Sequence, residues 1–184
     1  MFRFFLFSFQ IAFICSCGNK TVLEEVKLIP SYPSASGIEK LNNKYYIIGD
    51  DAKNLLILDS SLNAFDSISL FPFSEQRIPK TIKADLESIS LTKDNKLFLL
   101  GSGSLSPYRN TGWLIDPVKK EKQLIHLDTF YKRLELNGIK ELNIEGSCII
   151  PGAILLANRG NKKKKKNKLI LTSDDFWKNQ RDAP

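Results

Sequence analysis

Residues 44–51 read KYYIIGDD, residues 96–103 read KLFLLGSG, and residues 153–160 read AILLANRG. Each stretch is a short run of apolar residues that ends in polar turn residues, which is typical of a buried β-strand. Gly49 and Gly101 are 52 residues apart, and Leu100 and Leu156 are 56 residues apart. The chain therefore repeats a unit of about fifty residues, a spacing that indicates stacked β-sheets of the kind found in propellers.

Similar short segments surround each of these runs. A polar motif precedes each run: Ser36-Gly37-Ile38, Glu87-Ser88-Ile89 and Glu145-Gly146-Ser147. A second apolar strand follows each run, with the sequences LLILD, WLID and KLILT. We expect strands at residues 44–49, 55–59, 65–70, 86–91, 96–101, 112–116, 123–128, 148–150, 153–157 and 168–172, and no long amphipathic helix.

These segments predict an all-β fold, a partial β-propeller of about three four-stranded blades at residues 35–80, 81–135 and 140–184. Each blade is apolar on both faces and needs a neighbour on each side, which explains the continuous apolar runs. Closed propellers typically have about 4–8 blades, so we expect an incomplete ring and a truncated, N-terminal part of a longer propeller. A two-sheet sandwich would also have short strands, but it would not predict the repeated order of motifs.

The N-terminus has the features of an export signal. Residues 1–16 read MFRFFLFSFQIAFICS, in which Arg3 precedes an apolar stretch that is shorter than the ~20 residues of a membrane-spanning helix. Ile14-Cys15-Ser16-Cys17 resembles the lipobox of bacterial lipoproteins, and the resemblance implies that Cys17 is acylated and becomes the new N-terminus. We expect a signal peptide at 1–16, a tether at 17–34 and a lipid-anchored protein of the bacterial cell envelope, on either the outer or the cytoplasmic membrane. A plain cleaved secretory peptide is the alternative.

The cysteines and the net charge exclude several classes of protein. With Cys15 removed and Cys17 acylated, only Cys148 remains, so no intrachain disulfide is expected, and its apolar surroundings predict a buried structural thiol. Without Arg3 and the five lysines at 162–166, the net charge falls from +7 to +1. The lysine run indicates a solvated loop or a contact with an anionic surface. The spread of basic and aromatic residues that nucleic-acid binding requires is missing.

Carboxylates and arginines recur at equivalent places in the repeats, beside the ends of the apolar strands. The residues are Asp50, Asp51, Asp85, Glu87, Arg109, Glu145 and Arg159. The oxygen ligands suit Ca²⁺, and the arginines suit a phosphate or a carboxylate. A purely structural role in the turns is the alternative. The G-x-S-x-G, P-loop, H-E-x-x-H and paired C-x-x-C motifs are missing, and the single histidine, His126, is expected to be a packed or surface residue.

The order of motifs S-G-I, G-D-D, D-L-E, G-S-G-S, N-I-E-G and N-R-G resembles bacterial propellers of the esterase-like, phytase-like family and, more loosely, the SdiA-regulated family. The resemblance implies that Asp85, Glu87 and Glu145 are acids at the mouth of a central channel, with Arg109 and Arg159 as anion-binding partners. Ser88 departs from it, since glycine is usual at that place.

Two functions therefore remain, and the first is preferred: a non-catalytic binding protein, whose partner is a small anionic ligand or an envelope protein. The second is a Ca²⁺-dependent esterase or phosphoesterase. A non-functional truncated fragment is a third alternative.

Overall fold

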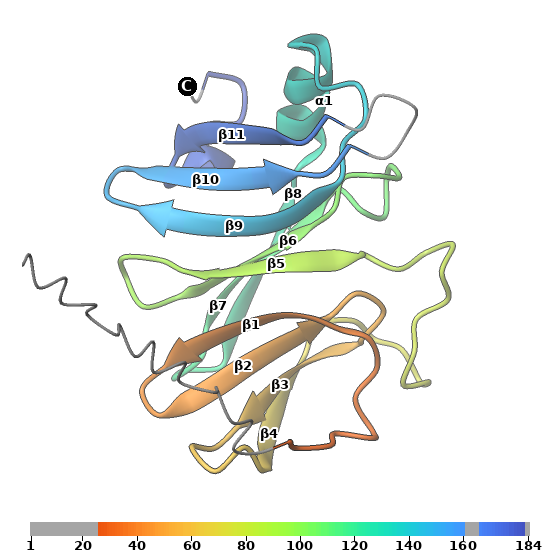
Figure 1. The fold of residues 1–184 in the computed structure, drawn as a ribbon, viewed down its shortest axis with the longest axis vertical. Helices are drawn as coiled ribbons and strands as arrows, with labels where there is room; N and C mark the ends of the chain where they lie inside the picture. The colour runs from red at the N-terminus through yellow and green to blue at the C-terminus, as the bar shows by residue number, and fades with distance from the viewer. Residues whose placement is uncertain (1–25, 161–165, 183–184) are drawn as a thin grey trace, which may run out of the picture.

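A computed structural model describes residues 26–160 and 166–182 of the chain. They form three antiparallel sheets, which we call blades 1, 2 and 3 (Figure 1). Blade 1 has the order β1 (Ala35–Leu41), β2 (Lys44–Gly49), β3 (Asn54–Leu58) and β4 (Ala64–Ser69). Blade 2 has the order β5 (Leu86–Leu91), β6 (Leu97–Gly101), β7 (Thr111–Asp116) and β8 (Glu121–His126). Blade 3 contains β9 (Ile144–Ile150), β10 (Ala153–Asn158) and β11 (Lys168–Ser173).

The expected fold class is confirmed: the chain is mostly β, with three successive sheets and no closed ring among the described residues. The third sheet has three strands, not four. The expectation was incomplete at two strands, because β1 was anticipated only as a polar motif and β9 begins at Ile144, four residues earlier than predicted.

Two helical segments were not expected from the sequence. Helix α1 (Asp128–Leu136) follows β8, and the 3₁₀ helix η1 (Phe176–Lys178) follows β11. In α1 the buried residues are Phe130, Tyr131 and Leu134, an i, i+1, i+4 pattern that nine residues display only once. The helix covers one end of the core between blades 2 and 3, where Phe130 packs against Phe176 of η1.

The core consists of two apolar layers between neighbouring blades and a smaller cluster on the outward face of blade 1, where Ile47, Leu56 and Leu58 pack against Ile29 and Tyr32. The layer between blades 1 and 2 includes Ile48, Leu55 and Leu99, and the layer between blades 2 and 3 includes Phe98, Leu100 and Ile154. Consecutive residues of β6 therefore point into different layers, and Leu97–Leu100 are all fully buried. The continuous apolar run of β6 follows from this burial on both faces.

The first strand of each blade lies next to its counterparts in the neighbouring blades, and Figure 1 shows β5 between β1 and β9. Serine hydroxyls join these inner strands. Ser36 Oγ donates to the carbonyl oxygen of Leu86 at 2.5 Å, and Ser147 of β9 shares hydrogen bonds with Ser88 and Ser90 of β5.

Each inner strand also contains a β-bulge at the same place. Ser36 has no partner in the pairing of β1 with β2. Glu87 likewise has none in the pairing of β5 with β6, and Glu145 has none in the pairing of β9 with β10. Bulges re-aim one side chain and are common beside functional sites. The repeat seen in the sequence therefore extends to the backbone, and two of the three bulged residues are glutamates.

The prediction for Cys148 was wrong, because its side chain is exposed. In β9, alternate residues point to opposite faces of the sheet, and the face that carries Cys148 has no covering blade among the described residues. His126 is a surface residue. No helix in residues 26–160 or 166–182 is both long enough and apolar enough to cross a bilayer. The predicted signal peptide at 1–16, Cys17 and lysines 162–165 lie outside the described residues.

Candidate functional site

One end of the three blades carries most of the polar residues singled out in the sequence. There the residue after the second strand of each blade donates its backbone N–H to the residue before the first strand. These hydrogen bonds run from Asp50 to Ser34 (3.1 Å), from Ser102 to Asp85 (2.9 Å) and from Arg159 to Asn143 (2.9 Å). The repeat thus brings Asp50, Asp85, Glu87 and Arg109 into one group. We call this group, together with Lys83 and Ser102, the rim cluster.

Asp85 is the centre of the rim cluster. Its side chain is only 8% exposed, and its backbone is left-handed, with φ +54°. Asp85 Oδ2 accepts a hydrogen bond from Ser102 Oγ at 2.6 Å and lies 2.9 Å from Arg109 Nη1. Burial alone would raise the pKa of this carboxyl, but hydrogen bonds from Lys83 and Ser102 and the charge of Arg109 outweigh burial and lower it. Asp85 is therefore ionised at neutral pH.

Lys83 was missed in the sequence and lies between two carboxylates. Its Nζ is 2.7 Å from Asp85 Oδ1 and donates a hydrogen bond to Asp50 Oδ2. Burial acts to lower the pKa of Lys83, and the two carboxylates together raise it. The separation of Lys83 from Asp50 along the chain explains the omission, since no local pattern reveals a contact between blades.

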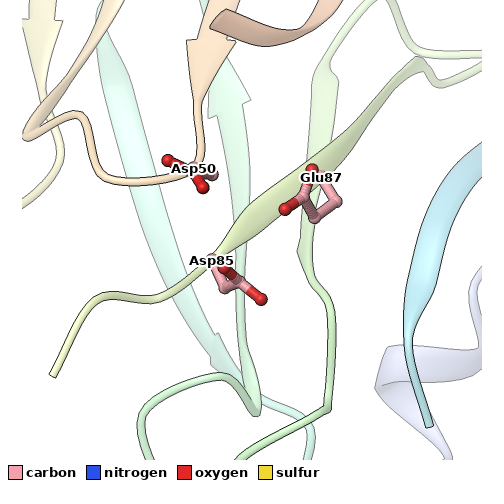
Figure 2. A group of neighbouring side chains, drawn as sticks. All are labelled: Asp50, Asp85 and Glu87. Atoms are coloured by element: carbon pink, nitrogen blue, oxygen red, sulfur yellow. The ribbon is translucent and has the colours of Figure 1, made fainter. Parts of the chain in front are cut away.

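Glu87 is the bulged residue of β5, and Figure 2 shows it beside Asp50 and Asp85. Its carboxyl has no hydrogen bond or ion pair with any residue of the described ranges. Burial first, and then the negative charges of Asp85, Glu145 and Asp50, raise the pKa of Glu87 from the ordinary 4.5 to about 7. Glu87 is thus a half-buried carboxyl that exchanges its proton near neutral pH.

The three carboxylates also have the geometry of a metal site. One oxygen each of Asp50, Asp85 and Glu87 lies within 4.8 Å of the others, and Asp50 Oδ1 is buried without a hydrogen-bond partner. However, the ammonium group of Lys83 already contacts two of these three carboxylates. Ca²⁺ takes six to eight oxygen ligands, so a calcium ion here would have to displace Lys83 and recruit further oxygens.

The other acids singled out in the sequence form separate ion pairs. Asp51 Oδ2 accepts a hydrogen bond from Arg77 Nη1 at 2.6 Å. Glu145 Oε1 lies 3.0 Å from Arg159 Nη1 and also accepts a hydrogen bond from Asn143. Glu145 nevertheless acts on Glu87 electrostatically, because its negative charge raises the pKa of Glu87.

Arg109 also faces groups of the protein itself. Besides Asp85, it donates to Ser104 Oγ at 2.7 Å, and its Nε is buried without a partner. Both arginines considered for anion binding therefore contact carboxylates. Around Glu87, the charges of Asp50, Asp85 and Glu145 are balanced by those of Lys83, Arg109 and Arg159. Ionisation of Glu87 consequently adds a net negative charge to this end of the blades.

A scan of the chain against protein-family models matches residues 31–183 to a family of unknown function, DUF6929. The chain belongs to the DUF6929 family. The match covers all three blades of the DUF6929 chain and the whole rim cluster. No curated protein matches the sequence.

Two hollows of the DUF6929 chain are further candidate sites, and the first borders the rim cluster through Ser104, which contacts Ser102, Asp85 and Arg109. One, of about 850 Å³, lies between the loop at Gly103–Ser106 and helix α1. The other, of about 500 Å³, is lined by residues of β8, the β5–β6 turn and the η1 segment, including His126 and Trp177. The rim cluster is the stronger candidate for a functional site, because it contains Glu87, a half-buried carboxyl whose pKa is raised to about 7.

Proposed function

We propose that this DUF6929 protein is a non-catalytic binding protein of the bacterial cell envelope, and that its rim cluster holds a cationic group of the ligand through Glu87. The observation that carries the proposal is the isolation of the Glu87 carboxyl. Asp50, Asp85 and Glu145 each contact a basic side chain, whereas Glu87 contacts none in the described residues.

A carboxyl without a partner in a half-buried place is unfavourable unless something else satisfies it. In the free protein a proton fills this role, because the pKa of Glu87 is about 7. A ligand ammonium group would replace the proton and form a charge-assisted hydrogen bond. Since ionised Glu87 leaves this end of the blades with an excess negative charge, a cation fits the site better than an anion.

The position of Glu87 supports the same conclusion. The bulge turns the residue out of the β5–β6 pairing, at the end of the blades where the polar loops gather. Glu145 has the equivalent place in β9, so a ligand that spans the inner strands would encounter both glutamates. In repeat folds of this kind, the loops at one end of the inner strands form the usual binding surface.

Attachment to the envelope is the second part of the proposal. It rests on the sequence alone: the Arg3 n-region, the apolar stretch to Ile14 and the lipobox-like Ile14-Cys15-Ser16-Cys17. Multiple acyl chains on Cys17 would provide the stable anchoring that one chain does not.

The binding proposal is tested with primary amines as probes, using spermidine and ethanolamine, with phosphate and acetate as anionic controls. Thermal unfolding and titration calorimetry compare the wild type with Glu87→Gln, which is similar in size but cannot ionise. We expect the amines to bind and to raise the melting temperature of the wild type only. We also expect the affinity for the amines to increase as the pH rises through about 7, because the amine and the proton compete for Glu87. Equal effects of the amines on both proteins would overturn the proposal.

The three clustered carboxylates favour one alternative, a Ca²⁺-dependent hydrolase of esters or phosphoesters, which the resemblance to the esterase-like, phytase-like family also suggests. In that case Ca²⁺ would stimulate hydrolysis of nitrophenyl acetate or nitrophenyl phosphate, and Glu87→Gln would abolish it. Calcium-dependent turnover that is lost in Glu87→Gln would replace the binding proposal with the hydrolase.

A further inference from the structure

The hollow of about 500 Å³ between blades 2 and 3, which we call the outer hollow, is separate from the rim cluster. Strand β8, the turn between β5 and β6 and the segment around η1 form its walls. Ligand pockets in proteins typically have volumes of about 300–1,000 Å³ and contain a few well-placed polar groups. The outer hollow therefore has a suitable size for a small ligand.

A comparison of β8 with β4, the outer strand of blade 1, shows that the outer hollow contains an unused polar group. Asp66 and Gln123 are equivalent, because each pairs with the residue two positions before a turn aspartate, Asp59 in blade 1 and Asp116 in blade 2. Asp66 accepts a hydrogen bond from Lys120 of the next blade at 2.6 Å. Gln123 has no such partner in the described residues, and its side chain borders the outer hollow.

Trp177 gives the outer hollow an aromatic surface. Its ring stacks on Phe98, with the two ring centroids 4.2 Å apart and the planes inclined by 30°. Because Phe98 is fully buried, this contact holds the indole ring in one position. Within the described part of the chain, Trp177 Nε1 has no hydrogen-bond partner and is not a buried atom. Its N–H is therefore an accessible donor beside an apolar ring.

The charged groups of the outer hollow balance one another. Three carboxylates and three ammonium groups line it: Asp94, Asp174, Asp175, Lys93, Lys96 and Lys178. Two of the lysines already form ion pairs, because the Nζ atoms of Lys93 and Lys178 each lie 3.5 Å from an aspartate oxygen. Unlike the rim cluster, the outer hollow therefore has no excess of carboxylates over ammonium groups that would favour an ionic ligand.

We infer that the outer hollow binds an uncharged oligosaccharide, with one sugar ring against Trp177 and sugar hydroxyls at Gln123 and the aspartates. A sugar ring has an apolar C–H face that packs on an aromatic ring, and each of its hydroxyls both donates and accepts hydrogen bonds. A purely apolar ligand would cover the amide of Gln123 and the carboxylates without giving them partners, which is unfavourable.

The fluorescence of Trp177 measures binding directly. The chain has two tryptophans, and Trp113→Phe leaves Trp177 as the single one. Trp113 is buried and its Nε1 has no partner, so phenylalanine removes an unsatisfied group and should be tolerated. The full chain with Trp113→Phe, in a detergent without a sugar headgroup, is titrated with chitotriose, maltotriose and cellotriose. We expect at least one of these trisaccharides to change the emission in a saturable manner.

Two substitutions in the outer hollow locate the bound sugar. Gln123→Ala should weaken binding about three- to tenfold, as the loss of one hydrogen bond does. Gln76→Ala is the matched control, because Gln76 is also an exposed glutamine but does not line the outer hollow, and it should bind like the parent. Trp177→Phe, followed by titration calorimetry, keeps a ring against Phe98 and should also weaken binding.

The outer hollow and the rim cluster are tested independently. Glu87→Gln should bind the trisaccharide with unchanged affinity, whatever its effect on amines. No saturable response to any of the three trisaccharides would overturn the inference. Unchanged affinity in both Gln123→Ala and Trp177→Phe would also overturn it, as would a larger response of Trp177 to spermidine or phosphate than to the trisaccharides.

Discussion

Lys83 Nζ lies 2.7 Å from Asp85 Oδ1, and both side chains are more than nine-tenths buried. The pair links the segment before β5 of blade 2 to the loop after β2 of blade 1, because Lys83 also contacts Asp50. A buried ion pair of this kind adds little stability compared with an apolar pair, but the loss of one partner leaves the other charge uncompensated. The rim cluster therefore depends on Lys83, a residue that the sequence did not reveal as a candidate.

Lys83→Met should destabilise the protein strongly. The substitution leaves Asp50 and Asp85 without their shared cation, and breaking a buried pair typically costs about 3–5 kcal/mol. Urea unfolding followed by circular dichroism measures the change. Arg77→Met is the matched control, because Arg77 is largely exposed and its pair with Asp51 should contribute less than about 1 kcal/mol. Equal losses in the two variants would contradict a central role for Lys83.

The same substitution should change the response to calcium. In the wild type the ammonium group of Lys83 occupies the carboxylate cluster, so we expect calcium to leave the melting temperature unchanged. In Lys83→Met, the carboxylates of Asp50, Asp85 and Glu87 are free of that cation, and calcium should raise the melting temperature. Stabilisation of the wild type by calcium, at a level that magnesium does not reproduce, would show that Lys83 does not exclude the ion.

Glu87→Gln should stabilise the protein in a pH-dependent manner. The folded protein holds the proton of Glu87 up to a pKa of about 7, whereas the unfolded chain releases it near the ordinary 4.5. Stability from this group is therefore fully present below the unfolded value and is lost as the pH rises through about 7. Thermal unfolding should show Glu87→Gln melting above the wild type at about pH 8.5, with a much smaller difference at about pH 4.5. A difference independent of pH would contradict the account.

Ser147→Ala should weaken the contact between blades 2 and 3. Ser88 and Ser90 are buried and share the hydroxyl of Ser147, so its removal leaves both without that partner. We expect a loss of about 1–3 kcal/mol in the free energy of unfolding. Ser69→Ala, at an exposed position of β4, serves as the control and should change stability by less than about 0.5 kcal/mol.

Cys17→Ser should abolish lipid attachment if the lipobox-like motif is read by the bacterial processing enzymes. Incorporation of labelled palmitate into the wild type, and its loss in Cys17→Ser, is the expected result. Cys15→Ser is the control, because a cysteine removed with the signal should not affect acylation. Labelling of both variants would contradict anchoring at Cys17.

The parts of the fold with local signals were predictable from the sequence. LFLL at 97–100 indicates a strand buried on both faces, and the structure buries all four residues. The recurrence of Gly49 and Gly101 before polar loops predicted the gathering of Asp50, Asp85, Glu87 and Arg109 at one end of the blades. Those signals are short-range or periodic, so they can be recognised in the sequence without knowledge of how the strands pack.

Other features depend on contacts between segments that are far apart in the chain. Lys83 was missed because its partner Asp50 belongs to another blade. Cys148 was assigned to the core because an apolar run does not reveal which face of the sheet is covered. Helix α1 was not predicted because a helix of nine residues is too short for its apolar residues to show a recognisable helical period.

Glu87 is a carboxyl without a partner in the described residues, and its raised pKa holds it near its titration point for a ligand. Carbon-13 NMR of the glutamate side-chain carboxyls, followed over pH and assigned by comparison with Glu87→Gln, measures this most directly. We expect one glutamate signal with a pKa of about 7 that is missing from Glu87→Gln. A Glu87 signal that titrates near the ordinary 4.5 would contradict it.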